Sequence, residues 1–221
     1  LTRQDGLVSV YLEQEPNLPE AATLRESLLA RGRFEDIADE REKWAAIARL
    51  DEYLHRLRTA SEQNPQAASG GEKKKAALAL ALSLKPDLLL LDEPTAGLDP
   101  KERIGIRNYI AELSRDKIIL FATHVVSDIE CIADKVLLLK DGEIIATGTP
   151  SQLIENMQGK VGEVVCTLSD VADLQGKYHI GNIRQRKNGM VLRLVGDELP
   201  EEAVRVDNDI DLEDVYLYYF E

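Results

Sequence analysis

The sequence lacks long apolar runs and has a deficit of positive charge. None of its apolar segments reaches the about 18 residues that a membrane-spanning helix needs, and the first residues do not form a signal peptide. We therefore expect no direct membrane insertion. Lys+Arg total 27 against Asp+Glu 40, and the resulting net charge of −13 disfavours sequence-independent binding to nucleic acid or to anionic lipid.

Cysteine is also scarce, because Cys131 and Cys166 are the only two. Each lies within an apolar run, where free, buried thiols are common, so we expect reduced cysteines and a cytoplasmic setting. Hydrophobic residues make up 44% of the 221 residues, which suffices for one good core with a small appendage.

Apolar periodicity divides the first 150 residues into a helical region and an α/β core. Helical spacing over residues 20–62, followed by an apolar helix that ends before Pro86, predicts a helical subdomain over about residues 20–84. The apolar runs 88–91 and 118–122 predict strands buried on both faces of a parallel sheet. With a helix expected between them, this order predicts a three-layer α/β core.

The remaining residues predict a hairpin and a small accessory domain. Asp141-Gly142 is a favoured two-residue turn and lies between two apolar runs. Pro150 ends the core, so we place one domain at residues 1–150 and a second, small α+β domain at 151–221. Periodicity alone leaves the role of the second domain open.

The most informative motif is the run of four leucines that leads into Asp92, Glu93, Pro94 and Thr95. A carboxylate at the carboxyl end of a buried parallel strand lies where open α/β folds bind ligands. Asp92 could there hold Mg²⁺, and Glu93 could polarise an attacking water as a general base. An isolated acidic pair would more simply cap a strand on the surface, but the leucine run and Pro-Thr favour the catalytic interpretation.

A second motif, Ser69-Gly70-Gly71-Glu72, begins the apolar helix. Ser69 and Glu72 have the spacing of a capping box, which is a purely structural explanation. Capping does not require paired glycines, whereas phosphate binding at a helix N-terminus benefits from exposed backbone N–H groups. We favour the phosphate interpretation because of the neighbouring motifs.

Two further residues, His124 and Gln14, are informative only in combination with the other motifs. His124 follows the run 118–122, where a single histidine is more often structural than catalytic. Gln14 follows a short apolar segment at a transition from strand to loop, and alone it carries almost no information.

Together these motifs, in this order, resemble the ABC ATPase family over essentially the whole chain. Gln14 matches the Q-loop, Ala68 to Glu72 the signature motif, and Leu88 to Glu93 the Walker B strand with its glutamate. Gly97-Leu98-Asp99 matches the D-loop, and His124 the switch histidine. The resemblance implies catalytic roles for Glu93, His124 and Gln14. It also implies that Asp92 and Gln14 bind Mg²⁺. The residues expected to contact the nucleotide are Ser69, Gly70, Gly71, Asp92 and Asp99.

The family resemblance also implies cofactors and partners. These are ATP with Mg²⁺, a second ATPase domain that completes a head-to-tail dimer, and a separate transmembrane permease. Each signature motif would serve the nucleotide of the partner domain. The expected location is the cytoplasm, peripheral on the inner face of the cell membrane.

The sequence departs from the family most clearly in having no G-x-x-x-x-G-K-[ST] segment, the phosphate-binding P-loop. The signature motif also has Ala68 for the usual Leu and Glu72 for the usual Gln. We therefore expect an incomplete P-loop NTPase core, truncated before Leu1, and a chain that alone is inactive.

Three functions stay open at this point. Residues 96–221 resemble ATPase subunits of ABC-2-type bacterial exporters, and this favours an ATP-hydrolysing exporter subunit. Residues 1–95 resemble ABC-F proteins, so a fragment of an ABC-F translation factor, which would bring nucleic acid back as a partner, is an alternative. This mixture suggests recombination between two families or a misassembled gene. The third alternative is a non-catalytic remnant without a P-loop.

Overall fold

The computed structural model describes residues 6–186 and 189–220. The chain forms two compact units, Leu1–His124 (unit 1) and Val125–Glu221 (unit 2). The domain boundary at residue 150, which follows from sequence motifs, stays a prediction.

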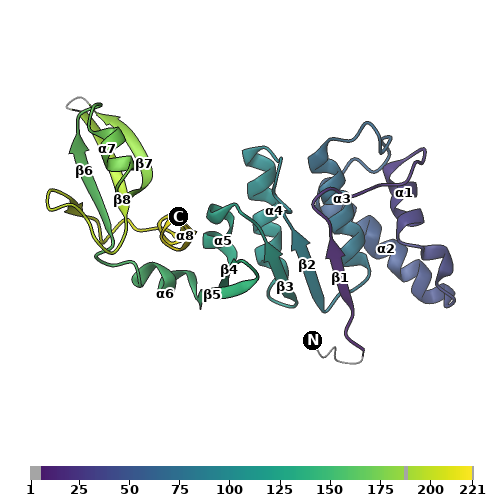
Figure 1. The fold of residues 1–221 in the computed structure, drawn as a ribbon. Coiled ribbons are helices and arrows are strands. Elements are labelled where there is room, and N and C mark those ends of the chain that lie inside the picture. The colour runs from purple at the N-terminus through teal and green to yellow at the C-terminus, as the bar shows by residue number, and fades with distance from the viewer. Residues whose placement is uncertain (1–5, 187–188, 221) are drawn as a thin grey trace. The chain divides into compact units, whose positions relative to one another are not determined.

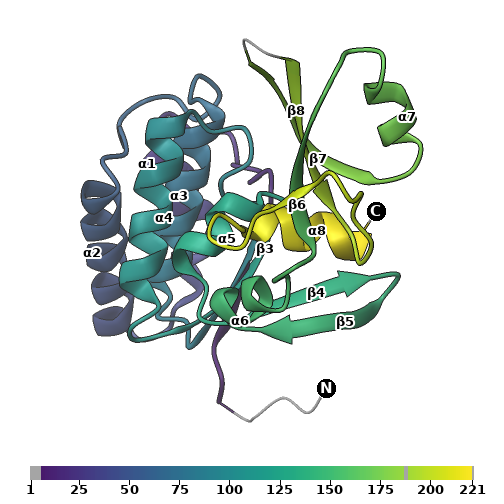
Figure 2. The same cartoon turned by 90° about the vertical axis from the view of Figure 1, so that its left-hand side faces the viewer.

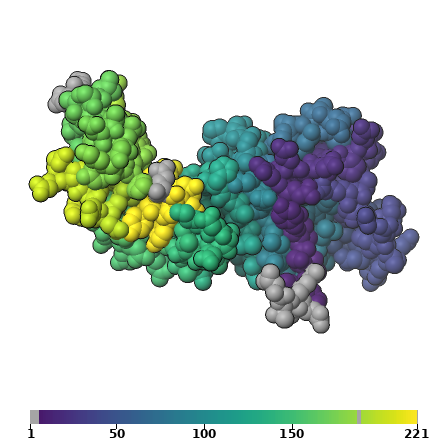
Figure 3. Space-filling view, in the orientation of Figure 1, coloured from purple at the N-terminus to yellow at the C-terminus, as the bar shows by residue number. Residues whose placement is uncertain are grey.

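Unit 1 is built on a three-stranded parallel sheet with the order β1-β2-β3 (Figure 1). Its strands are β1 (Ser9–Leu12), β2 (Leu88–Asp92) and β3 (Ile118–Ala122). Leu12 pairs with Leu91, and Asp92 pairs with Ala122, so the three carboxyl ends lie at one edge of the sheet. The N-terminal segment that contains β1 runs along the surface of this unit (Figure 3).

The predicted helical subdomain is helical in the structure. The helices of unit 1 are α1 (Leu24–Arg31), the short 3₁₀ helix η1 (Phe34–Asp36), α2 (Glu40–Arg56), α3 (Gly70–Ser83) and α4 (Pro100–Leu113). On α2 the apolar stripe buries Ile47, Leu50 and Leu54, as its spacing predicts. Trp44, at the N-terminal end of the same stripe, is 64% exposed.

The sheet of unit 1 is buried on one face, so the prediction of strands buried on both faces is wrong. Leu89 and Leu91 point into the core, whereas Ile118 and Leu120 on the opposite face are 66% and 51% exposed. Helices α1 to α4 lie on the same side of β3 (Figure 2). The described part of unit 1 thus has two layers rather than three.

Unit 2 contains the predicted hairpin. Strands β4 (Val136–Lys140) and β5 (Glu143–Gly148) pair antiparallel, and helices α5 (Val126–Ile132) and α6 (Pro150–Glu155) flank them in sequence. Asp141 and Gly142 both have positive φ, at 53° and 85°. This is the conformation that a type I′ turn requires, so the two-residue turn is confirmed.

The rest of unit 2 is a four-stranded antiparallel sheet with the order β7-β8-β6-β9. It comprises β6 (Val161–Cys166), α7 (Val171–Gln175), β7 (His179–Arg186), β8 (Gly189–Val195), β9 (Val204–Arg205) and α8 (Leu212–Phe220). Leu192 and Leu194 of β8 pack with α7, while Val195 packs with Leu212 and Val215 of α8.

The two cysteines differ in burial. Cys166 is half-buried, whereas Cys131 is exposed, so the predicted burial of Cys131 is wrong. Across residues 6–186 and 189–220, the search for a helix with the length and apolarity of a membrane span finds none.

Candidate functional site

The predicted acidic residues lie at the carboxyl edge of the unit 1 sheet. Asp92 is the last residue of β2, and Glu93 follows it directly. His124 lies two residues beyond the end of β3, and Gln14 two residues beyond the end of β1. Because the three strands are parallel and in register, residues far apart in the sequence leave the sheet at one edge.

The structure brings Glu93 and His124 together. Glu93 Oε1 accepts hydrogen bonds from the His124 backbone N–H at 2.8 Å and lies 2.6 Å from His124 Nδ1. Thr123 Oγ1 donates to Glu93 Oε2 at 2.9 Å. The residue pair that the sequence places at the ends of two strands is therefore one hydrogen-bonded cluster.

The surroundings of Glu93 keep its carboxyl group ionised. Partial burial works to raise its pKa, but the hydrogen bonds from the His124 ring, the His124 N–H and Thr123 outweigh burial and hold the pKa below its ordinary value. An ionised carboxylate can only accept hydrogen bonds, and the short contact between Oε1 and His124 Nδ1 suits the tautomer that has its proton on Nδ1. Oε2 retains one acceptor position, which could bind and polarise a water.

Asp92 faces a different partner. The Tyr11 hydroxyl donates to Asp92 Oδ2 at 2.8 Å, and this bond is the main reason that the pKa of Tyr11 is raised. The carboxylate has further acceptor positions and suits a hydrated Mg²⁺. The described residues contain no group of three or more His, Cys, Asp or Glu side chains that could hold a metal ion. Asp92 would thus be a single carboxylate ligand to Mg²⁺, and any further ligands would be of another kind.

The glycine motif begins α3 as expected of a capped helix. Ser69 Oγ accepts from the Glu72 N–H at 3.2 Å, and Glu72 Oε2 accepts from the Ser69 N–H at 2.8 Å. The two glycines have different surroundings. A Cβ at Gly70 would meet open space, whereas a Cβ at Gly71 would overlap the carboxylate of Glu102.

Asp99 caps the neighbouring helix, α4, and accepts from the Glu102 N–H at 2.8 Å, with Pro100 at the first helical position. The Glu102 carboxylate pairs with Lys75 of α3, with Nζ and Oε1 2.8 Å apart. A side chain at Gly71 would therefore displace the Glu102 carboxylate from its present position, while nothing local explains Gly70. An open glycine at a helix N-terminus fits an approaching anion.

This difference yields a prediction for stability. Gly70→Ala should leave the free energy of unfolding unchanged or raise it by up to about 1 kcal/mol, because alanine lowers the entropy of the unfolded chain and meets no neighbour. Gly71→Ala should be the less stable of the two, because Glu102 must leave Lys75. Urea unfolding of both variants measures this, and equal midpoints would contradict the assigned role of Gly71.

Two residues near the site escape sequence analysis. Tyr11 contacts Asp92 across β1 and β2, and Lys74 of α3 bonds the turn that follows Glu93. Tyr11 lies in the segment that resembles ABC-F proteins, but the sequence assigns it no contact with Asp92. Lys74 stands within three consecutive lysines, which read as an exposed polar stretch.

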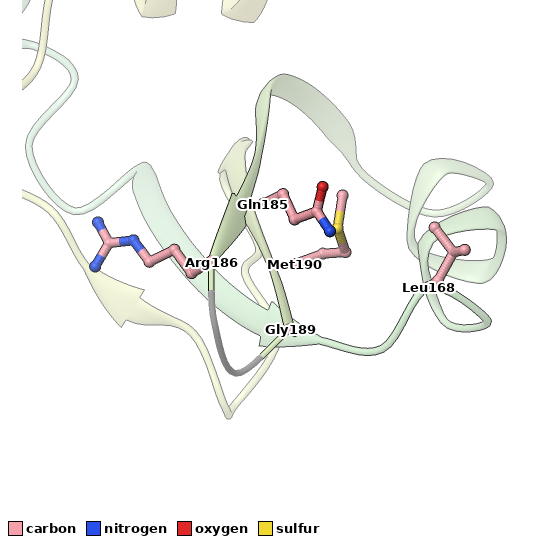
Figure 4. Close-up of a pocket in the computed structure, with 5 residues that line it drawn as sticks. All are labelled: Leu168, Gln185, Arg186, Gly189 and Met190. Atoms are coloured by element: carbon pink, nitrogen blue, oxygen red, sulfur yellow. The ribbon is translucent and has the colours of Figure 1, made fainter.

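A hollow in unit 2 lies apart from these motifs. Its lining residues are Leu168, Gln185, Arg186, Gly189 and Met190. Gln185 and Met190 point to one side of β7 and β8, and Arg186 points to the other (Figure 4). None of the predicted site residues lines this hollow.

Comparison with known proteins finds similar ATP-binding proteins. A family model described as "ABC transporter" matches residues 3–96. The energy-coupling factor transporter ATP-binding protein EcfA of Methanothermobacter thermautotrophicus is 40% identical over 113 residues, which cover 50% of this chain and 36% of that protein. The Nod factor export ATP-binding protein I of Neorhizobium galegae is 33% identical over 221 residues, which cover 96% of this chain and 62% of that protein.

Solved structures give the same result. CbiO1 from Clostridium perfringens, part of the ABC transporter complex cbiONQ, is 28% identical and matches with a TM-score of 0.54 over 66% of this chain and 58% of that one. The chain is homologous to the ATP-binding subunits of ABC transporters and has the mixed α/β fold of their ATPase domain. It spans 36% and 62% of the length of the two sequence relatives named above.

Proposed function

We propose that this chain supplies the hydrolytic carboxylate and the signature helix of an ABC ATPase that energises export through a separate membrane subunit. The observation that carries the proposal is the cluster of Glu93, Thr123 and His124 at the carboxyl edge of the sheet, next to Asp92. Homology to ATP-binding subunits supports ATP as the ligand.

In this proposal each motif has one task. Glu93 accepts a hydrogen bond from the attacking water through Oε2, and His124 fixes the orientation of that carboxylate through Oε1. Asp92 and Gln14 contribute ligands to Mg²⁺, which neutralises phosphate charge when bound. Ser69 and Gly70 offer backbone N–H groups and Asp99 a further contact to the nucleotide of a second ATPase domain.

Export as the direction of transport is supported by the relatives named Nod factor export ATP-binding protein I. The relative EcfA is named for an energy-coupling factor transporter, and this name does not specify export. The accessory residues 151–221 contain none of the matched motifs, so we assign them no part in hydrolysis. A fragment of an ABC-F factor and a non-catalytic remnant remain the competing functions.

We predict that these 221 residues alone neither bind Mg-ATP tightly nor hydrolyse it. High phosphate affinity in P-loop enzymes needs a nest of N–H groups, a lysine and a Ser/Thr on Mg²⁺, and the sequence has no such segment. Without that cradle the two carboxylates, Asp92 and Glu93, repel a polyphosphate.

The test is calorimetric titration of Mg-ATP into the chain and into a version that carries the P-loop segment of an ABC homologue before Leu1, here called the completed ATPase. We expect that only the completed ATPase, and not the 221-residue chain, binds and hydrolyses Mg-ATP. Micromolar binding by the folded, monodisperse chain would contradict the assigned need for a P-loop. A completed ATPase that binds Mg-ATP without hydrolysing it would favour the remnant.

A further inference from the structure

Lys74 is a buried lysine in the signature helix. Its side chain is 7% exposed, and its Nζ donates to the backbone carbonyl oxygens of Glu93 at 2.9 Å and Ala96 at 2.6 Å. Lysine is almost never fully buried unless it is paired, because removal of the ammonium group from water is costly. Burial lowers the pKa of Lys74, and the negative charges of Glu93 and Glu15 partly oppose this. A solvated surface lysine would need none of these contacts.

The two carbonyls belong to the turn that carries Glu93. The Glu93 oxygen also accepts from the Ala96 N–H at 3.1 Å, which closes a turn between β2 and α4. Glu93 itself has φ of 45°, in the left-handed region that residues with a Cβ rarely adopt. Such a conformation persists only where the surroundings hold it, and it is found most often at functional sites.

The side chain and the main chain of Glu93 are therefore held by different partners. Thr123 and His124 hold the carboxylate, whereas Lys74 bonds the carbonyl of the same residue. Both sets of bonds act on one residue in an unfavourable backbone conformation. Loss of either set should let Glu93 rotate away from the position in which Oε2 can meet a water.

We propose that Lys74 is a positioning residue, whose buried ammonium group fixes the turn that presents Glu93 and ties this turn to the N-terminal half of α3. Lys74 lies one helical turn after Ser69 and Gly70. If, as in the proposed function, an anion binds at that helix N-terminus, any shift of α3 is passed to Glu93 through this contact. The role of Glu93 in hydrolysis rests on the proposed function, but the positioning of Glu93 by Lys74 does not.

The structural part of the proposal is tested on the 221-residue chain by amide hydrogen exchange. Lys74→Met removes the charge and both bonds while it keeps an unbranched apolar stem. We expect the N–H groups of Ala96 and His124, both bonded to Glu93, to exchange at least about 10-fold faster, as the loss of charge-assisted bonds implies. The matched control is Lys43→Met, which removes a lysine of α2 that pairs with Glu35 of η1 and should leave these two amides unchanged.

The kinetic part uses the completed ATPase. We expect Lys74→Met to lower kcat for ATP hydrolysis by roughly 10- to 100-fold, as misplacement of a catalytic group does, while KM for Mg-ATP changes less than about 3-fold. Faster exchange together with unchanged kcat would support the positioning of Glu93 by Lys74, but it would contradict the proposed role of Glu93 in hydrolysis. Unchanged exchange at Ala96 and His124 would overturn the positioning by Lys74.

If Lys74→Met does not fold, the unaltered chain provides a second measurement. Nuclear magnetic resonance should detect couplings across the hydrogen bonds from the Lys74 ammonium nitrogen to the carbonyl carbons of Glu93 and Ala96. Absence of both couplings would overturn the proposal.

Discussion

Glu93→Gln is expected to slow ATP hydrolysis by the completed ATPase by roughly 10²- to 10⁴-fold, the range associated with loss of a general base. The amide keeps the shape of the side chain, and its oxygen can still accept from the His124 N–H. The amide nitrogen can donate to Thr123 Oγ1, which now donates to Glu93 Oε2. Geometry is therefore preserved while basicity is lost. Steady-state phosphate release measures the effect.

Two controls make this experiment specific. Mg-ATP affinity should stay within about 3-fold of the unaltered protein, because removal of transition-state interactions does not require weaker ground-state binding. Glu112→Gln, which removes an exposed partner of Arg56, should leave turnover unchanged. Near-normal turnover in Glu93→Gln, in a protein that binds Mg-ATP, would remove Glu93 from the role of general base.

Local sequence rules predict those parts of the molecule that depend on neighbours along the chain. Ser69 and Asp99 cap helices because short polar side chains bond the first free N–H groups. Asp141-Gly142 forms its turn because both residues tolerate positive φ. The leucine run predicts a buried strand, and the change to a charged residue at Asp92 predicts where that strand ends. None of these features needs information from distant residues.

Contacts between residues far apart in the sequence could not be predicted from the sequence. Tyr11 bonds Asp92, which is 81 residues away in the sequence, and Lys74 bonds the carbonyl of Glu93, which is 19 residues away. No periodicity in the sequence predicts either contact. The exposed face of β3 shows the same limit, because an apolar run predicts burial without saying how many faces the rest of the unit covers. The roles of the individual site residues remain predictions for the same reason: geometry brings Glu93 and His124 together, and only chemistry can assign their tasks.

A buried ion pair joins β8 to α8 in unit 2. Arg193 of β8 donates to Asp214 of α8 through Nε at 2.8 Å and through a terminal nitrogen at 2.7 Å, and the two side chains are 8% and 3% exposed. The same guanidinium also bonds the carbonyl of Asp209. The bonds to Asp214 raise the pKa of Arg193, so its charge persists at every accessible pH. Loss of Asp214 would leave that buried charge with only the more distant Glu163, whose Oε1 lies 4.0 Å from a terminal nitrogen of Arg193.

We therefore expect Asp214→Ala to lower the free energy of unfolding of unit 2 by about 3–5 kcal/mol, the usual cost of breaking a buried pair from one side. Replacement of both partners, Arg193→Met with Asp214→Leu, should recover most of this loss, because the buried guanidinium charge is removed together with its partner and the apolar side chains can pack, while Glu163 is exposed enough to remain hydrated. Asp197→Ala is the matched control, since Asp197 pairs with Lys160 in a more exposed setting and should cost about 1 kcal/mol or less. Urea denaturation followed by a probe in α8, such as the tyrosine fluorescence of Tyr216, would measure all three. A loss in Asp214→Ala no larger than that in Asp197→Ala would mean that α8 is held to the sheet by its apolar face, through Leu212 and Val215, and not by the ion pair.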